Sequence, residues 1–456
     1  MKKILILCLF LVSGISVWAQ TQPDFRPLRY NDDFTYIKAD TAQSLYDKVK
    51  YIPLSKSGKY YGSIGGEARL QYIFTKNNKW GDEPDDPDGY LLSRYLFHTD
   101  IHLGMFRLFG QFQSSIASSM PDPSPVDENT ADIHQAFLDI NFINNEKTRL
   151  FARLGRQEMY YGSQRLISVR EGPNNRLAMD GFKAVLAKKD FQADAFYMHP
   201  VANVPGSFND KLNDNAKLWG AYTVLNNIHI LHNIDLYYLG LWKSSTNLDN
   251  VTGEELRHTV GTRIWKNKGN WKYDLEALYQ FGRLADMDIS AWSVSSYVNY
   301  EFSTVKFEPV IGLKTEIISG DANRNDKKLQ TLNPLYPRGG YFGLVAMIGP
   351  SNLFDIHPSI DMSLTKKLSF GMDYDIFWRW SDNDGLYAPN MQLLYSGEGI
   401  AETFVGTQLV GDFEYAFNPF FSLTVEGAWF NAGAFLKEAG TGKDYYYAAF
   451  TATFRF

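Results

Sequence analysis

The sequence is dominated by stretches in which polar and apolar side chains alternate over about ten residues, the length of a tilted membrane strand. In one stretch, Arg94, His98 and Asp100 alternate with Tyr95 and Phe97. Because successive side chains of a strand point to opposite faces, each stretch predicts a strand with one apolar and one polar face. Strands of soluble sandwiches usually span only about 5–6 residues. The length therefore favours an all-β, transmembrane antiparallel β-barrel, with lipid outside and water inside.

The connections between these stretches show a second regularity, in which short turns alternate with longer polar segments. We expect tight turns on the periplasmic side and long loops outside the cell, which is the bacterial barrel pattern. This organisation predicts about 18 strands, with 16 as the alternative count. The predicted turns lie near Gly104, Asn144–Lys147, Lys188–Asp190, Asn226–Asn227, Asn267–Gly269, Ser303–Thr304, Lys366–Lys367 and Asn418–Pro419. The predicted long connections are Asn77–Gly89, Ser114–Ala131, Met159–Arg176, Pro200–Ala216, Lys243–Glu255, Arg283–Asp288, Ser319–Pro350, Ser381–Ala401 and Asn431–Asp444. Within Ser319–Pro350, the segment 340–349 fits a strand, a short helix or an inward-folded loop.

Composition agrees with a barrel but also fits another class of protein. Aromatic residues make up 15% of the chain, yet only 45% of the residues are hydrophobic, as expected where half of each strand stays polar. An extracellular β-rich polysaccharide enzyme would share the aromatic excess. The net charge of −6 gives no indication of nucleic-acid binding.

The first 19 residues read as a secretory signal peptide. Lys2 and Lys3 precede an apolar run that ends in the small-residue site Val17-Trp18-Ala19, where we expect cleavage. The only cysteine, Cys8, lies inside this run, so we predict no disulfide. Residues 20–60 are rich in proline and charge and are predicted to be a periplasmic lead-in, followed by the barrel at 61–456.

The end of the chain predicts the location of the protein. Tyr446, Ala448, Phe450, Ala452, Phe454 and Phe456 share one face of a final strand. An amphipathic terminal strand that ends in Phe resembles the signal of outer-membrane barrels. We therefore expect the outer membrane of a Gram-negative bacterium, contact with its lipid, and recognition of the strand ending in Phe456 by the barrel assembly machinery.

Cationic side chains concentrate around one predicted strand pair. If the Met159–Arg176 loop folds inward, its arginines would narrow the lumen and attract carboxylates, which guanidinium groups bind in pairs of hydrogen bonds. Strict alternation from Arg153 places Arg156 on the lipid side unless the strand ends or bulges there. The alternative interpretation is that interspersed charges solvate and brace the wall. The candidate path residues are Arg153, Arg156, Arg165, Arg170, Arg176, Lys183, Arg94, Arg263 and Arg379.

The same region carries a resemblance to a known family. The segments Gly155-Arg156-Gln157-Glu158, Tyr161-Gly162, Arg165-Leu166, Asn175-Arg176 and Asp180-Gly181-Phe182 resemble a motif of the alginate export outer-membrane proteins. The resemblance implies a monomeric eighteen-stranded barrel whose basic lumen passes an acidic polysaccharide such as alginate, with Arg153, Arg156, Arg165 and Arg176 lining or bracing the path. This lumen carries about as many carboxylates as cations, which favours a broader range of anionic or hydroxyl-rich solutes.

Two other classes remain as alternatives. A barrel-embedded hydrolase needs a nucleophile beside a base, and the eight histidines are scattered without a recognisable catalytic context. A surface adhesin or receptor would use the long loops to bind a ligand without conducting. The motifs of metal, nucleotide and other cofactor sites are missing from the sequence. The sequence therefore predicts a channel for an anionic saccharide or organic anion, not an enzyme, with no cofactor.

Overall fold

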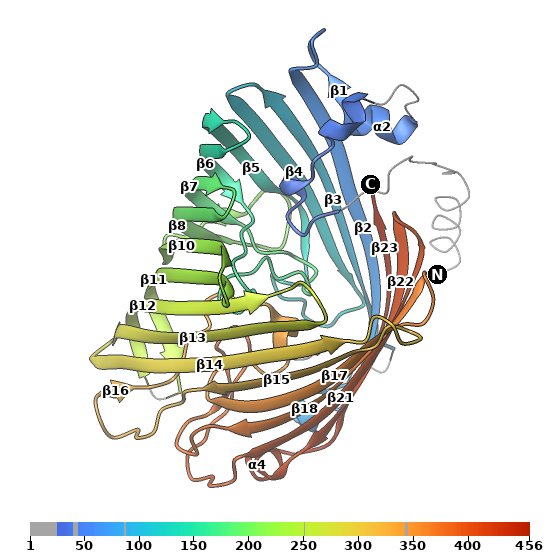
Figure 1. The fold of residues 1–456 in the computed structure, drawn as a ribbon. Helices are drawn as coiled ribbons and strands as arrows, with labels where there is room; N and C mark the ends of the chain where they lie inside the picture. Colours follow the sequence, from blue (N-terminus) through green and yellow to red (C-terminus); the bar gives the residue numbers. More distant parts are fainter. Residues whose placement is uncertain (1–24, 40–43, 86–87, 250, 343–344) are drawn as a thin grey trace.

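Eighteen antiparallel strands form one closed barrel (Figure 1). The computed structural model describes residues 25–39, 44–85, 88–249, 251–342 and 345–456. Strands adjacent in the chain pair with each other, and β2 pairs with β23 to close the sheet, with Glu67 opposite Arg455. Closure leaves no unpaired edge, as a sheet in hydrocarbon requires. The wall strands are β2 (Tyr60–Lys76), β3 (Tyr90–Leu103), β4 (Phe106–Ser118), β5 (Asn129–Asn144), β6 (Thr148–Gln157), β7 (Met179–Lys188), β8 (Phe191–Ala202), β10 (Ala216–Ile228), β11 (His232–Leu248), β12 (Val251–Lys266), β13 (Trp271–Leu284), β14 (Met287–Glu301), β15 (Val310–Ile318), β17 (Leu353–Ser363), β18 (Leu368–Arg379), β21 (Phe404–Asn418), β22 (Phe421–Ala432) and β23 (Tyr445–Arg455).

The alternation seen in the sequence sets which side of the wall each residue faces. On β3, Arg94 and His98 are buried inside the barrel, whereas Tyr95 and Phe97 are exposed on its outer surface. Lipid removes the need to cover such an aromatic outer surface with protein. The prediction of an eighteen-stranded barrel is therefore confirmed.

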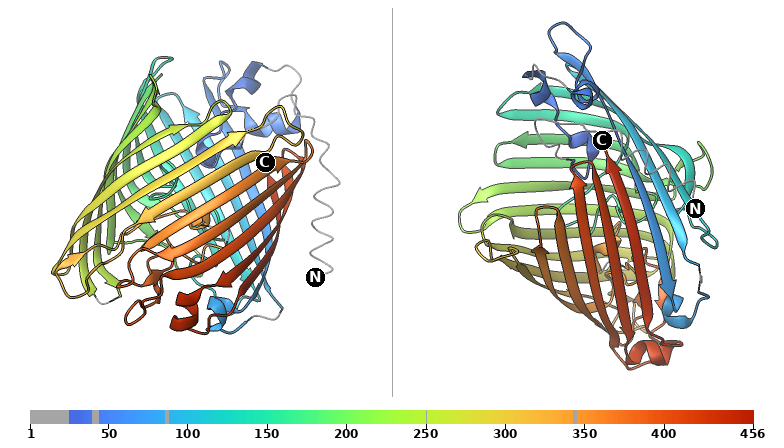
Figure 2. Two further views of the ribbon diagram at one scale, coloured as in Figure 1. Left: turned by 60° about the horizontal axis from the view of Figure 1, so that its bottom comes forward. Right: turned by 90° about the vertical axis from the view of Figure 1, so that its right-hand side faces the viewer.

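The C-terminus and the described N-terminal segment from residue 25 onward lie at the end of the barrel that carries the short turns, the predicted periplasmic end (Figures 1 and 2). Outside the wall, short elements occur at both ends of the barrel. No helix of the described residues is long and apolar enough to cross a membrane. These elements are η1 (Arg29–Asn31), η2 (Thr35–Ala39), α2 (Leu45–Lys50), β1 (Ile52–Pro53), α3 (Asn78–Gly81), β9 (Lys211–Leu212), β16 (Lys328–Leu329), η3 (Gly339–Phe342), β19 (Leu386–Tyr387), β20 (Leu393–Tyr395) and α4 (Ala434–Ala439).

Some predicted connections were wrong. The predicted turn at Asn226–Asn227 belongs to β10, which continues to Ile228. The predicted long loops Lys243–Glu255 and Arg283–Asp288 are largely strand, because β11 and β12 pair as far as Leu248 and Val251, and β13 and β14 pair as far as Leu284 and Met287. β11 and β12 have 17 and 16 residues, more than the roughly 9–11 that a tilted strand needs to cross the membrane. Because no lipid selects apolar side chains beyond the membrane, the ends of these strands lack the alternating pattern and were predicted as loops.

The predicted signal peptide lies outside the described residues. In the predicted lead-in, the described residues form η1, η2, α2 and β1, and the first wall strand begins at Tyr60. Ser44 caps α2 through its side chain, which accepts the amide of Asp47 over 3.2 Å, and Asp47 bonds back to the Ser44 amide. The lead-in therefore has defined local structure and a small hydrophobic cluster of Phe34, Ile37, Tyr46 and Tyr51, against which Tyr61 and Phe420 of the barrel pack.

Candidate functional site

The connection between β6 and β7, residues 158–178, folds into the lumen, and we term it the constriction loop. Arg165 donates a hydrogen bond to Ser293 of β14, and its guanidinium lies 3.6 Å from the carboxylate of Glu316 on β15. Ser115 of β4 donates to the carbonyl oxygen of Asn174 over 2.9 Å. Eight wall strands separate β4 from β14 in the strand order. The loop therefore crosses the barrel interior, as the hypothesis of a cationic constriction requires.

The connection from β15 to β17, residues 319–352, also turns inward, and we term it the second lumen loop. The amide of Ser168 donates to the carbonyl of Tyr336, and the amide of Tyr336 donates to the carbonyl of Leu166, both over 2.9 Å. Ile167 and Tyr336 form a parallel bridge between the two loops. Of the alternatives left by the sequence for 340–349, the short helix is found at its start, in η3 (Gly339–Phe342), and Ile348 is buried in the interior cluster.

The second lumen loop is fixed to the extracellular connection 380–403. Asp384 accepts hydrogen bonds from the amide of Asp321 over 2.7 Å and from the hydroxyl of Thr331 over 2.6 Å. Burial and the neighbouring Asp384 raise the pKa of Asp321 to about 6. Because this pKa is raised, the junction holds best at acidic pH and weakens as pH rises through about 6.

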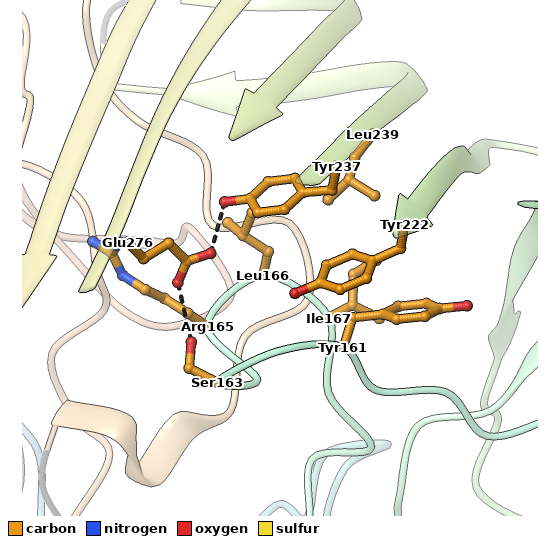
Figure 3. Close-up of a pocket in the computed structure, with 9 residues that line it drawn as sticks. All are labelled: Tyr161, Ser163, Arg165, Leu166, Ile167, Tyr222, Tyr237, Leu239 and Glu276. Carbon is orange, nitrogen blue, oxygen red and sulfur yellow. Dashed lines mark hydrogen bonds between the residues drawn. The ribbon is translucent and has the colours of Figure 1, made fainter. Parts of the chain in front are cut away.

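Stacked tyrosines fill the space between the constriction loop and the wall (Figure 3). Tyr161 stacks on Tyr222 with ring centroids 4.7 Å apart, and Tyr222 stacks on Tyr237 at 5.4 Å. Glu276 accepts hydrogen bonds from Tyr237 (2.6 Å) and Ser163 (3.1 Å). The cavity that remains is about 10 Å³, room for about one water molecule. Solute passage through this side of the lumen therefore requires the loop to move.

Six of the nine predicted path cations lie in the barrel interior against carboxylates. Each such pair neutralises its own charge and ties together wall strands or the constriction loop. For these six residues, the geometry fits the bracing interpretation. They are Arg94 with Glu67 (2.7 Å) and Glu171, Arg153 with Asp139 (2.6 Å), Arg165 with Glu316 (3.6 Å), Arg176 with Glu158 (2.7 Å), Lys183 with Asp194 (2.8 Å) and Arg263 with Asp274 (2.6 Å).

Arg156 faces away from the lumen, so its predicted place on the path was wrong. β6 and β7 pair without a register shift from Thr148 to Gln157, which keeps Arg156 in phase with the exposed Leu154. On this outer face Arg156 forms an ion pair with Asp180 at 2.9 Å. The strand has neither ended nor bulged at this point, so alternation decides the orientation.

Arg379 lies inside the barrel at the extracellular end of β18. Its guanidinium donates to the carbonyl oxygens of Asp382, Asp384, Ile400 and Glu402 over 2.6–3.0 Å. All four carbonyls belong to the connection 380–403, so Arg379 holds this loop over the barrel mouth.

Arg170 differs from the other predicted cations. It lies on the constriction loop with its guanidinium 5.8 Å from the ring centroid of Tyr336, and it has no carboxylate partner among the described residues. Lys243 forms no salt bridge within the described part of the chain, although it stands opposite Glu255 in the register of β11 and β12; that carboxylate pairs with Arg257 at 2.6 Å. The sequence interpretation missed Lys243 because it assigned the residue to a loop; the buried Leu239 and Leu241 show its inward phase.

One side of the lumen is acidic. Asp361 (β17), Asp373 (β18), Asp412 (β21) and Glu426 (β22) keep the inward phase of the buried Asp375 and form no ion pair with a described residue. Asp412 stands directly opposite Glu426 in the strand register. An anion must therefore pass a wall of its own charge on this side.

The buried histidines give little support to the hydrolase alternative. His357 contacts Asp355 and Asp375 at 2.9 and 2.7 Å, so carboxylates occupy both of its ring nitrogens, one of which a nucleophile would need; His134 contacts Glu158 through Nε2 at 2.8 Å. Among the described residues, no group of three or more His, Cys, Asp or Glu side chains could hold a metal ion.

A closed eighteen-stranded barrel with an apolar outer face and a polar lumen defines an outer-membrane channel. The family model for alginate export matches residues 60–449, and the chain belongs to this family. A search of curated proteins found no match.

Solved outer-membrane structures from Pseudomonas aeruginosa share the fold. OccK3 (OpdO) superposes with a TM-score of 0.56 at 11% identity, covering 87% of this chain and 95% of that chain. OpdK with vanillate gives 0.56 at 11% identity, covering 87% and 98%. OccK2 (OpdF) in complex with glucuronate gives 0.57 at 9% identity, covering 86% and 97%. At these identities the similarity establishes the fold alone.

Proposed function

We propose that the barrel passes anionic, hydroxyl-rich solutes, with uronate saccharides as the preferred class and alginate as one member. The observation that carries the proposal is the partly exposed Arg170 on a loop that crosses the lumen, without a carboxylate partner among the described residues. A guanidinium that is not already neutralised can bind the carboxylate of a passing solute. Lys243, which stands opposite a carboxylate already paired with Arg257, supplies a second positive charge at the extracellular end of β11.

The family and the solved structures support this solute class. Alginate, named in the family description, is a polymer of uronates, and two of the similar structures hold the carboxylates glucuronate and vanillate. The paired arginines serve the path indirectly, because they hold the constriction loop and the wall in position.

The test is conductance through a planar bilayer under a salt gradient, with block by glucuronate oligomers. We expect anion preference and block by uronates, and weaker block in Arg170→Ser and Lys243→Ser. Losing one charge-assisted contact weakens block about ten-fold. Arg283→Ser is the matched control, because Arg283 forms an exposed pair with Asp288 on an extracellular hairpin. Equal block in the wild type, the two lumen variants and the control would exclude this path.

A further inference from the structure

The N-terminal segment, residues 25–39 and 44–53, enters the periplasmic end of the barrel. Figures 1 and 2 show η1, α2 and β1 at the end where the C-terminus lies. The side chain of Tyr30 is buried between Phe109 and Phe137, with ring centroids 6.0 and 5.3 Å away. Phe109 and Phe137 pair in register on β4 and β5 and face the lumen. The tip of the segment is therefore inside the channel.

Tyr30 engages two arginines of the lumen, Arg107 and the predicted path residue Arg153. The guanidinium carbon of Arg153 lies 4.1 Å from the Tyr30 ring centroid, a cation–π contact. Arg107 donates a hydrogen bond to the Tyr30 carbonyl oxygen, and the Tyr30 hydroxyl donates to the carbonyl of Glu158 over 2.8 Å. The segment thus covers cations of the periplasmic half of the lumen.

The same tip packs against the constriction loop. Leu28 and Tyr30 share a hydrophobic cluster with Val169, the residue before Arg170. Arg176 donates to the carbonyl oxygen of Pro27 over 3.0 Å. The segment therefore closes the space directly beside the proposed anion-binding residue.

The segment is attached to the barrel wall by few backbone contacts. Its backbone pairs with the described wall only through Ile52 and Pro53 on β2. Besides the contacts of Pro27 and Tyr30, Arg29 donates to the carbonyl oxygens of Gly66 (3.2 Å) and Phe456 (3.0 Å). Withdrawal of residues 25–50 breaks no strand pairing of the barrel.

One buried group opposes docking. The ammonium of Lys50 is fully buried near the rings of Phe34, Tyr46 and Phe456, and it has no hydrogen-bond partner in the described residues. Burying a charge without a partner is unfavourable. The docked state therefore contains a built-in destabilising contact, as expected of a segment that leaves its site.

We propose that residues 25–39 and 44–50 are a displaceable plug that closes the periplasmic mouth and regulates access to Arg170, with β1 as its fixed attachment to β2. The proposal rests on the proposed anion path only for the identity of the solute, because the plug would gate any solute that uses this lumen. Docked, it buries Tyr30 in the lumen and locks the constriction loop through Val169. Withdrawn, it frees both the mouth and the loop.

The experiment compares single-channel records of wild type, Tyr30→Ala and Arg29→Ala, with Tyr36→Ala as control because Tyr36 is exposed on the same segment. We expect open probability to rise about ten-fold in the first two variants and to stay at the wild-type level in the control. Heat-dependent electrophoretic mobility confirms that each barrel is folded. Folded variants with wild-type open probability would overturn the plug.

A second measurement, thiol labelling, tests the plug independently of the Tyr30→Ala and Arg29→Ala variants. Val169→Cys, at a site covered by Leu28 and Tyr30, is labelled with a thiol reagent in the otherwise wild-type chain and with Tyr30→Phe, which keeps the ring. A docked plug predicts slow labelling that accelerates when the hydroxyl is lost. Fast labelling in both backgrounds overturns the plug. If open probability rises in Tyr30→Ala and Arg29→Ala but the open channel shows no anion preference, the plug proposal is supported and the proposed anion path is refuted.

Discussion

Arg165 offers the sharpest test of how the constriction loop is held. Its side chain is 2% exposed, and its partner Glu316 is fully buried on β15. At 3.6 Å, an effective dielectric constant near 20 gives an attraction of about 4–5 kcal/mol. Removing one partner of such a buried pair costs about 3–5 kcal/mol, because the other charge stays buried without compensation.

We therefore expect Arg165→Ala to release the constriction loop from β14 and β15. The released loop should raise single-channel conductance and current noise. The barrel should also unfold at a lower urea concentration, as measured by its heat-dependent electrophoretic mobility. Arg165→Met combined with Glu316→Gln removes both charges and should recover most of the lost stability.

The control is Arg283→Ala, which removes an exposed pair and should cost less than about 1 kcal/mol. The reasoning is refuted if Arg165→Ala conducts and unfolds like the wild type, or if the double variant is as unstable as the single one.

Three further predictions follow from individual side chains. Burial lowers the pKa of Lys50 from 10.5 to about 7, and the nearby charge of Arg29 lowers it further. Between these two pH values Lys50 is protonated in the withdrawn plug and neutral in the docked plug. Docking therefore strengthens, and conductance falls, as pH rises from about 7 to 10. Lys50→Met should remove this pH dependence in bilayer recordings. Arg156→Leu should leave the reversal potential in bilayer recordings unchanged, because this side chain lies on the outer face and pairs with Asp180 there. Asp412→Asn should shift the reversal potential further toward anions, because it removes one charge of the acidic wall; no shift would show that anions do not pass this wall.

The wall could be predicted from the sequence because its physics is local. Whether Arg94 or Tyr95 faces lipid depends only on the parity of the strand, and each strand repeats the decision. Arg156 follows the same rule, and its expected place on the path came from the motif, not from the alternation. The strand continues at Lys243 on β11 with the same parity, but the polar–apolar alternation of the sequence is lost there, since no lipid selects apolar side chains beyond the membrane.

The interior could not be predicted because its contacts join distant parts of the chain. Arg165 and Ser293 are 128 residues apart, and Arg29 and Phe456 are 427 apart. Such contacts exist only once the barrel has closed. The sequence identified the cations of the Met159–Arg176 loop, but it could not show that most of them find carboxylates and that Arg170 does not. The N-terminal segment has no alternation, so nothing local marked it as part of the lumen.

The central claim is that the lumen passes anionic saccharides once the loop and plug move. The most direct measurement is the swelling rate of liposomes that contain the folded protein, in glucuronate oligomers and in neutral glucose oligomers of equal length. Faster swelling with the uronates, reduced in Arg170→Ser, is the predicted result. Equal swelling rates in glucuronate and glucose oligomers would contradict the account. So would the absence of swelling in both sugars when the liposomes contain the Tyr30→Ala barrel.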